Sequence, residues 1–335
     1  MNHSAVRILS NRDVKQALDA SESELVDIIA RAYQRYEDGS VINPTSAFMR
    51  LPSPPRSRII ALPSFSGGER PLAGLKWVSS FPGNLERGLP RASAVMMINY
   101  GVTGRVRTIL DGTDISSQRT AASAAVAARA LLSGRTPEVM GVVGCGPINR
   151  EIINYVKRTV GSINRLCVHD LDPDRGERFA ASFAGTDLEA ATVSRIDDVF
   201  ATADLIAFAT NAIEPYVPER IALERRHVIL HISLRDLQPG HVVDARNCVD
   251  DANHAFSSQT SLHLAEQATG RRDFLTATIG ALIADPGLAE RKFAGAAAVF
   301  SPFGLGVLDL AVAEVVENYC IERNMGTTID DFFTV

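Results

Sequence analysis

The hydrophobic residues of the chain follow two patterns, with a change at residue 139. Before it, short apolar runs separated by turns are typical of strands in a mixed or antiparallel sheet. These runs lie at residues 58–62, 72–79, 93–99 and 105–110, with a glycine turn at 101–104. After residue 139, apolar strands alternate with helical segments, the order that builds a parallel, doubly wound sheet. The strands expected there lie at residues 139–144, 165–170, 188–193, 205–210, 227–233 and 297–301.

Four segments have helical patterns. Residues 21–36 are amphipathic, with Ser21 as the expected N-cap and Glu24 completing a capping box. Residues 114–133 are dense in alanine, a strong helix former, and end at Gly134. We expect this helix to lead from the first part of the chain into the second. The other two helices are expected at residues 173–183 and 304–322.

The composition favours a globular enzyme over a nucleic-acid-binding or membrane protein. The 335 residues allow two domains, and 46% hydrophobic with 22% charged residues is typical of a soluble globular enzyme. The net charge of −5 argues against binding to nucleic acid. The sequence contains neither a run of eighteen apolar residues nor a signal-peptide pattern at its N-terminus. We therefore expect no membrane partner, and a cytoplasmic location.

The cysteines show no paired spacing; they are Cys145, Cys167, Cys248 and Cys320. We expect buried, reduced thiols and no metal site.

Residues 139–170 carry the pattern of a dinucleotide site. An apolar run ends in Gly144-Cys145-Gly146, a helical segment follows, and a second apolar run ends at Asp170. Such a turn holds a pyrophosphate at the helix N-terminus, and the acid about 20 residues on accepts hydrogen bonds from ribose hydroxyls. Asp170 would repel a 2′-phosphate and so favours NAD over NADP, although His169 beside it weakens this preference. The alternative is a doubly wound domain without a nucleotide.

Asn149 stands where the glycine fingerprint normally has a third small residue. The geometry of the cofactor turn is therefore expected to differ slightly from the usual one.

Three cations are candidates for the chemistry. Lys76 lies inside an apolar run, where loss of water lowers the pKa of an amine and makes it usable in catalysis. The alternative is a solvated lysine on an edge strand. Arg119 lies early in the alanine-rich helix, where a cation is unfavourable with the helix dipole, unless it is a packed surface arginine. Arg50 ends a strand-like run and either reaches a site or is a solvated loop residue.

Asp236 follows the apolar strand at residues 227–233. Ligands of doubly wound sheets bind beyond the carboxyl ends of strands, so this acid is a candidate to accept and donate protons. Its alternative is a turn or N-cap aspartate. His231 and Ser233 lie at the same strand end, where packed core residues are the commoner interpretation.

Four segments, in order along nearly the whole chain, resemble the ornithine cyclodeaminase and mu-crystallin family: GLKW (74–77), DGTDISSQRTAA (111–122), GVVGCGPI (141–148) and GLGVLDLAVAEV (304–315). Within that family, RIIALPS (58–64), HISLRD (231–236) and NMGTTID (324–330) are most similar to the 2,3-diaminopropionate biosynthesis dehydrogenases of the staphyloferrin B type.

The resemblance implies a particular fold and assembly. Residues 121–303 form an NAD-binding Rossmann domain with a doubly wound parallel sheet. Residues 1–120 and 304–335 form an α+β domain that binds substrate and makes a homodimer.

The resemblance also implies roles for individual residues. Lys76 and Asp236 are catalytic, whereas Arg50, Lys76 and Arg119 bind substrate. The residues matched to cofactor binding are Arg119, Gly144, Gly146, Pro147, Ile148 and Asp170.

The activity implied is NAD-dependent oxidation of a CH–NH group. N-(1-amino-1-carboxy-2-ethyl)glutamate is cleaved to 2-oxoglutarate and L-2,3-diaminopropionate, for siderophore or antibiotic biosynthesis. Asp236 is expected to be the base and Lys76 to activate water.

The alternatives are an ornithine or lysine cyclodeaminase, a ketimine reductase, and a crystallin-like binding protein. Residues 233–240 differ from the matching segment of true cyclodeaminases, which disfavours ornithine cyclisation.

Overall fold

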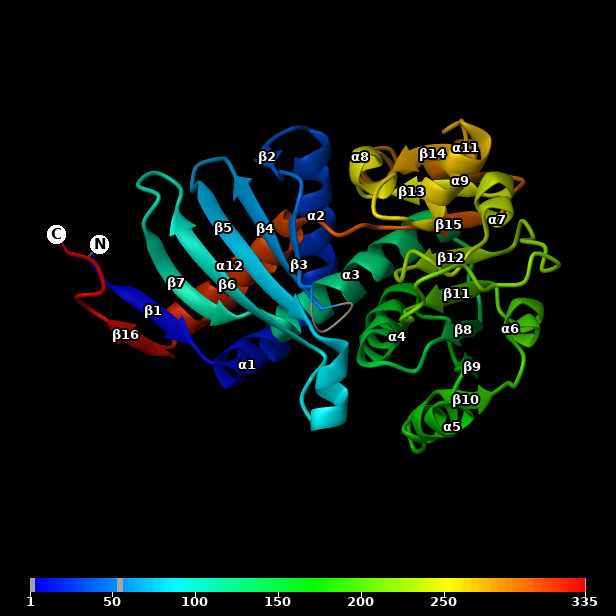
Figure 1. Cartoon of the computed structure of the whole chain (residues 1–335), viewed down its shortest axis with the longest axis horizontal. Helices are drawn as coiled ribbons and strands as arrows, with labels where there is room; N and C mark the ends of the chain where they lie inside the picture. The colour runs from blue at the N-terminus through cyan, green and yellow to red at the C-terminus, as the bar shows by residue number, and fades with distance from the viewer. Residues whose placement is uncertain (1–3, 53–56, 335) are drawn as a thin grey trace. The chain divides into compact units, whose positions relative to one another are not determined.

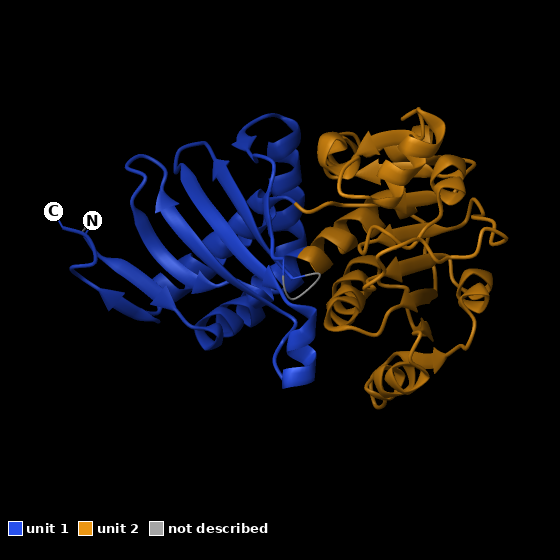
Figure 2. Cartoon of the chain, viewed as in Figure 1, with its two compact units in different colours: residues 1–119, 305–335 blue, residues 120–304 orange. Residues whose placement is uncertain are grey.

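The computed structural model describes residues 4–52 and 57–334. The chain divides into two compact units (Figure 2). Unit 1 contains residues 1–119 and 305–335, and unit 2 contains residues 120–304. The division falls inside helix α3 (Thr113–Leu132), the predicted alanine-rich helix.

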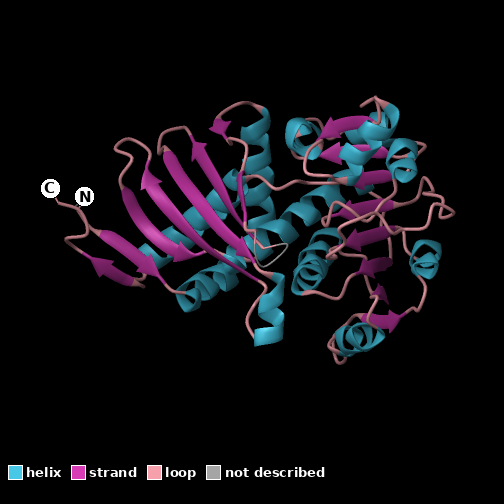
Figure 3. Ribbon diagram, viewed as in Figure 1, coloured by secondary structure: helices cyan, strands magenta, loops and turns pink. Residues whose placement is uncertain are grey.

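Unit 1 is a mixed sheet with helices on one face (Figures 1 and 3). The strands run in the order β16-β1-β7-β6-β5-β4-β2, and β3 pairs with β4. Only β1 and β7 are parallel among these pairs, so the predicted mixed sheet is confirmed. The strand bounds are β1 Val6–Leu9, β2 Val41–Ile42, β3 Ala47–Arg50, β4 Arg58–Ser66, β5 Leu72–Ser80, β6 Ala92–Tyr100, β7 Val106–Asp111 and β16 Thr327–Ile329.

The helices of unit 1 are α1 (Asn11–Ser21), α2 (Leu25–Glu37), the short 3₁₀ helix η1 (Pro82–Arg87) and α12 (Gly306–Glu322). Most of α12 is buried against β4, β5, α1 and α2. A helix that is apolar nearly all round has to be covered on most sides. Gly306 allows this close packing, because a Cβ there would lie 3.0 Å from the backbone oxygen of Leu62.

The predicted start of the first helix was wrong. Ser21 is the last residue of α1, and α2 begins at Leu25 without a side-chain cap. The capping box belongs to α1, where the Ser10 side chain accepts from the backbone of Asp13 and the Asp13 carboxylate accepts from the backbone of Ser10. Both helices bury an apolar stripe. Because only residues 22–24 separate them, the hydrophobic pattern does not show where the first helix ends and the second begins.

Unit 2 is the predicted doubly wound domain. All strand pairs of its sheet are parallel, in the order β10-β9-β8-β11-β12-β15-β13-β14. Helices cover both faces (Figure 3). The strand bounds are β8 Val139–Val143, β9 Arg165–His169, β10 Glu189–Thr192, β11 Leu205–Phe208, β12 Val228–His231, β13 Arg246–Val249, β14 Leu275–Thr278 and β15 Ala298–Phe300.

The core strands of unit 2 are buried on both faces, as their continuous apolar runs require. The helices of this unit are α4 Pro147–Val160, α5 Pro173–Ala181, α6 Ile196–Thr202, α7 Pro239–Asp244, α8 Ala252–Ala255, α9 Ser261–Thr269, α10 Ile279–Ala284 and α11 Leu288–Phe293. In the part of the chain that the structure describes, no helix is both long and apolar enough to cross a membrane.

Candidate functional site

The glycine turn after β8 has the geometry of a dinucleotide site. Gly144 has a φ of +93°, and a Cβ there would lie 2.7 Å from the carbonyl oxygen of Ala209, so only glycine fits. Gly146 caps α4, and a Cβ at this position would meet nothing within 4 Å. Pro147 occupies the first turn of α4, where its missing N–H is not needed, and Ile148 follows it. The open side of Gly146 and the N-terminus of α4 suit a pyrophosphate.

Asp170 follows β9 and faces this turn. One carboxylate oxygen accepts from the backbone N–H of Cys145 at 2.7 Å, and the other accepts from Asp172 at 2.9 Å. Arg175 lies 3.9 Å away through Nη1. Burial, and then the nearby Asp170, raise the pKa of the Cys145 thiol to about 12, so this cysteine is not a nucleophile. The buried carboxylate beside the turn fits the ribose of NAD.

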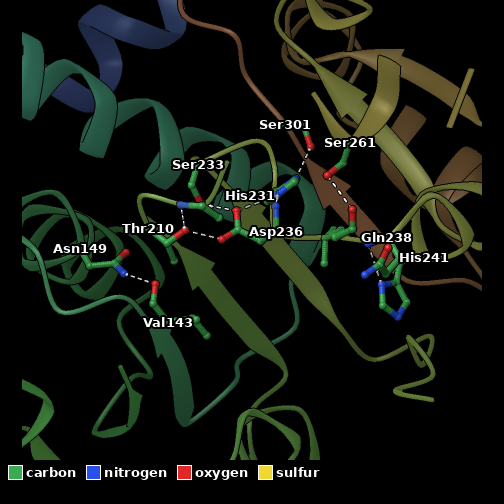
Figure 4. Close-up of polar contacts among 12 residues, drawn as sticks. Val143, Asn149, Thr210, His231, Ser233, Asp236, Gln238, His241, Ser261 and Ser301 are labelled. Carbon is green, nitrogen blue, oxygen red and sulfur yellow. Dashed lines mark hydrogen bonds and ion pairs between the residues drawn. The ribbon is translucent and has the colours of Figure 1, made fainter. Parts of the chain in front are cut away.

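Asn149 braces the turn from inside α4 (Figure 4). Its side-chain Nδ2 donates to the carbonyl oxygens of Val143, at 2.9 Å, and Gly144, at 2.7 Å. The side chain is fully buried, and its Oδ1 has no hydrogen-bond partner among the described residues. A small residue at this position would allow close packing; Asn149 instead ties the glycine turn to its helix through hydrogen bonds.

Asp236 lies in a buried polar network beyond β12 (Figure 4). Oδ1 accepts from the Thr210 hydroxyl and Oδ2 from the Ser233 hydroxyl, each at 2.5 Å. His231 Nε2 lies 3.1 Å from Oδ2, and His231 Nδ1 lies 3.1 Å from the Ser301 hydroxyl. The structure therefore brings the predicted Asp236, His231 and Ser233 together, with Thr210 and Ser301 as partners that the sequence did not single out.

Burial raises the pKa of Asp236, but the hydrogen bond and charge of His231, with the two hydroxyls, outweigh it and lower the pKa below the usual value. The carboxylate has no exposed area, and both of its oxygens already accept hydrogen bonds. This environment holds an ionised carboxylate in one orientation. The role of Asp236 as a base stays a prediction.

Unit 1 contains a second buried charged cluster, around Lys76 of β5. Lys76 Nζ lies 2.7 Å from Asp309 Oδ2 and 3.2 Å from the Ser116 hydroxyl. Arg119 Nε donates to the other oxygen of Asp309 at 3.1 Å. Lys76 is 2% exposed and Asp309 is fully buried. The cluster joins two predicted residues, Lys76 and Arg119, through an acid that the sequence reasoning missed.

The alternative of a solvated edge-strand lysine is wrong, because β5 pairs with β4 on one side and β6 on the other. Burial lowers the pKa of Lys76 from 10.5 to about 8, even though Asp309 acts in the opposite direction. A substantial fraction of the side chain is therefore a neutral amine near pH 8. Such an amine can accept or donate a proton.

Arg50 does not join this cluster. It is the last residue of β3, pairs with Arg58 of β4 in the sheet, and is exposed. Its substrate-binding role stays a prediction.

Asp309 could have been noticed in the sequence as an acid inside the apolar run GVLDLAVAEV. Acids in apolar helices are rarely left unpaired.

The four cysteines are free and buried. Within residues 4–52 and 57–334, no group of three or more His, Cys, Asp or Glu side chains could hold a metal ion.

A family model matches residues 5–324, which is most of the chain. The chain belongs to the ornithine cyclodeaminase/mu-crystallin family. An alanine dehydrogenase from Archaeoglobus fulgidus is 26% identical over 97% of this chain and 98% of the relative. The N-((2S)-2-amino-2-carboxyethyl)-L-glutamate dehydrogenase of Staphylococcus aureus is 24% identical over 96% of this chain and 97% of the relative.

Among solved structures, the Thermococcus litoralis Δ¹-pyrroline-2-carboxylate reductase in complex with NADH and L-proline has the same fold. Its TM-score is 0.87 at 22% identity, with 97% of this chain and 100% of that chain covered. Together with the glycine turn and Asp170, these family findings support an NAD-dependent oxidoreductase that acts on CH–NH groups.

Proposed function

We propose that the protein oxidises N-(1-amino-1-carboxy-2-ethyl)glutamate, a secondary amine that joins a glutamate unit to a diaminopropionate unit. The glutamate α-carbon loses a hydride and the amine nitrogen loses a proton, which leaves a C=N bond. Gly144 and Gly146 would hold NAD⁺, which would supply the hydride acceptor. Addition of water to the C=N bond, followed by C–N cleavage, gives 2-oxoglutarate and L-2,3-diaminopropionate. The products suit siderophore or antibiotic biosynthesis.

The observation that carries this proposal is the buried Lys76–Asp309–Arg119 cluster. Hydride can leave the α-carbon only when the amine nitrogen has a free lone pair, so a base must first remove its proton. A lysine with a pKa of about 8 is suited to this step near neutral pH. A guanidinium beside it can bind a substrate carboxylate through two parallel hydrogen bonds.

We assign the other residues accordingly. Lys76 takes the amine proton and returns it to the nitrogen of the C=N bond. As a neutral amine again, it then accepts a proton from the attacking water, while Arg119 and Arg50 bind substrate carboxylates. Asp236 holds Thr210 and Ser233 in place at the carboxyl end of the unit 2 sheet. The residues proposed to hold NAD are Gly144, Gly146, Pro147, Ile148 and Asp170, with Arg119 as the family resemblance implies.

Alanine dehydrogenase activity is the second candidate, because the Archaeoglobus relative of that name covers nearly the whole chain. Both candidates remove a hydride from a carbon that bears nitrogen and a carboxylate. They differ in whether the nitrogen carries a second substituent.

A substrate panel tests the proposal. The protein is mixed with NAD⁺ and either N-(1-amino-1-carboxy-2-ethyl)glutamate, L-alanine or L-ornithine, and NADH formation is followed by absorbance. We expect the first amine to give the highest kcat/KM, with one 2-oxoglutarate released per NADH. Pyruvate from alanine as the favoured reaction would establish the second candidate. Proline and ammonia from ornithine, without net NADH, would establish a cyclodeaminase.

We also propose a homodimer formed through the helix-free face of the unit 1 sheet. Residues alternate between faces along a strand, so Lys76 and Met96 are buried whereas their neighbours Trp77 and Val95 are 42% and 47% exposed. Trp77 and Val95 pair directly across β5 and β6. A second copy would remove this apolar pair from water. Light scattering should give twice the 36.1 kDa chain mass, and Trp77→Glu should reduce it to a single chain.

A further inference from the structure

Helix α12 carries two fully buried acids, and each binds partners from other elements of unit 1. Glu317 accepts from Arg107 Nε at 3.0 Å and from the Thr108 hydroxyl at 2.5 Å, both on β7. Asp309 lies two turns earlier and binds Lys76 of β5 and Arg119 of α3. Glu317 attaches the helix to one strand, whereas Asp309 joins two candidate substrate-binding cations.

We propose that Asp309 is a positioning residue whose two carboxylate oxygens hold Lys76 and Arg119 side by side, so that one α-amino acid unit is recognised through its nitrogen and its carboxylate together. This inference rests on the proposed function of Lys76 and Arg119. None of the sequence motifs or comparisons assigns a role to Asp309.

The geometry of Arg119 supports this arrangement. Its Nε is the atom that binds Asp309, and within residues 4–52 and 57–334 neither Nη1 nor Nη2 has a hydrogen-bond or ion-pair partner, so their edge is open to a second carboxylate. That edge binds carboxylates with two parallel hydrogen bonds and thus sets their orientation. Because the same Asp309 binds Lys76 through its other oxygen, the amine and the arginine edge keep a constant separation.

The charges around Lys76 predict in which direction its pKa should move when each neighbour is replaced. The charged groups that act on Lys76 are Asp309 from α12 and Arg119 from α3. Burial lowers the pKa of Lys76 most; Asp309 raises it, and Arg119 lowers it. Removal of the Asp309 charge must therefore move the titration of Lys76 in the opposite direction from removal of the Arg119 charge.

Competitive acetylation measures this titration without any substrate. The whole protein is treated with trace acetic anhydride at a series of pH values, and modified peptides are quantified by mass spectrometry. The other lysines of the chain are Lys15, Lys157 and Lys292, which serve as internal references. In the unsubstituted protein we expect Lys76 to react with a midpoint near pH 8.

Asp309→Asn should lower the Lys76 midpoint by about one pH unit, and Arg119→Gln should raise it. Glu317→Gln is the matched control: it removes another buried acid of α12 and should lower thermal stability without moving the Lys76 midpoint. Midpoints that shift in the same direction in both cluster variants, or in neither, overturn the proposal. If Asp309→Asn fails to fold, the Arg119→Gln variant alone tests the proposal. A raised Lys76 midpoint in that variant supports a carboxylate shared by Lys76 and Arg119, and an unchanged or lowered midpoint overturns it.

Steady-state kinetics of Asp309 variants then test whether this residue positions Lys76 and Arg119 for substrate binding. Asp309→Asn should raise KM for the preferred amine about tenfold, with a shift in the pH profile of kcat/KM toward acid. Rescue of KM by Asp309→Glu, at least in part, is expected because the charge is restored. If the substrate panel rejects the proposed amine, the acetylation result still stands, since it requires no substrate.

Discussion

Asp309 in unit 1 and Asp236 in unit 2 are both carboxylates with no exposed area, but their partners differ in kind. Asp309 binds two cations, one of which is a lysine with a pKa lowered to about 8. Asp236 binds two hydroxyls and lies beside a histidine. In unit 1, burial therefore creates a group that titrates near neutral pH. In unit 2, the hydrogen bonds to Asp236 outweigh burial and keep its carboxylate ionised and in one orientation.

The difference between the two acids predicts that Lys76 in unit 1, and not Asp236 in unit 2, accepts the proton of the substrate amine. Lys76→Ala should lower kcat/KM on the preferred amine by about a thousandfold, because the group that removes the amine proton is lost. Asp236→Asn should lower it less, and should also reduce the free energy of unfolding by about 1–3 kcal/mol, since buried hydroxyls lose a charged acceptor. Both are measured by initial rates and urea unfolding.

Lys292→Ala, at an exposed lysine of α11, is the control and should leave kcat/KM unchanged. A larger kinetic loss in Asp236→Asn than in Lys76→Ala would reverse our assignment and restore Asp236 as the base.

A smaller effect is expected at the glycine turn, whose carbonyl oxygens accept hydrogen bonds from the neutral amide of Asn149. Asn149→Ala removes the donor to the carbonyls of Val143 and Gly144. Weaker support of the turn should raise the dissociation constant of NAD about tenfold, as measured by calorimetry. The variant Asn149→Asp should bind NAD more weakly still, because a carboxylate faces the same carbonyls. Unchanged affinity in both variants would show that the turn is held without Asn149.

The smallest predicted effect is the pH response of folding, which we assign to unit 2. His227 and His241 each accept a backbone N–H at Nδ1, from Glu224 and Gln238, at 2.9 and 3.2 Å. Burial lowers the pKa of both histidines from the usual 6.5. The unfolded chain then binds more protons, so stability should fall as pH drops below about 6.5.

Differential scanning calorimetry at pH 7 and pH 5 measures this response. The double variant His227→Asn, His241→Asn should be less stable at pH 7 but should lose only part of the pH dependence, a difference of a few degrees in Tm. An identical pH dependence in the variant would place the response elsewhere.

Local patterns were sufficient for most of the architecture. The alternation of apolar strands with helical segments after residue 139 predicted the parallel sheet, and short runs with turns predicted the mixed sheet. The first helix was misplaced because α1 and α2 are both amphipathic and only a short turn separates them. A capping box was expected at Ser21 but lies at Ser10, since such boxes recur by chance in polar segments.

The sequence by itself determined the change from a mixed to a parallel sheet, the glycine turn, the acid at residue 170 and the candidacy of Lys76, because each depends on neighbours along the chain. Only the tertiary structure decided that Lys76 is buried in an interior strand and shares Asp309 with Arg119. Asp309 is 233 residues from Lys76 and 190 from Arg119. The pKa of a buried amine depends on water exclusion and on charges within a few ångströms, and folding alone sets both.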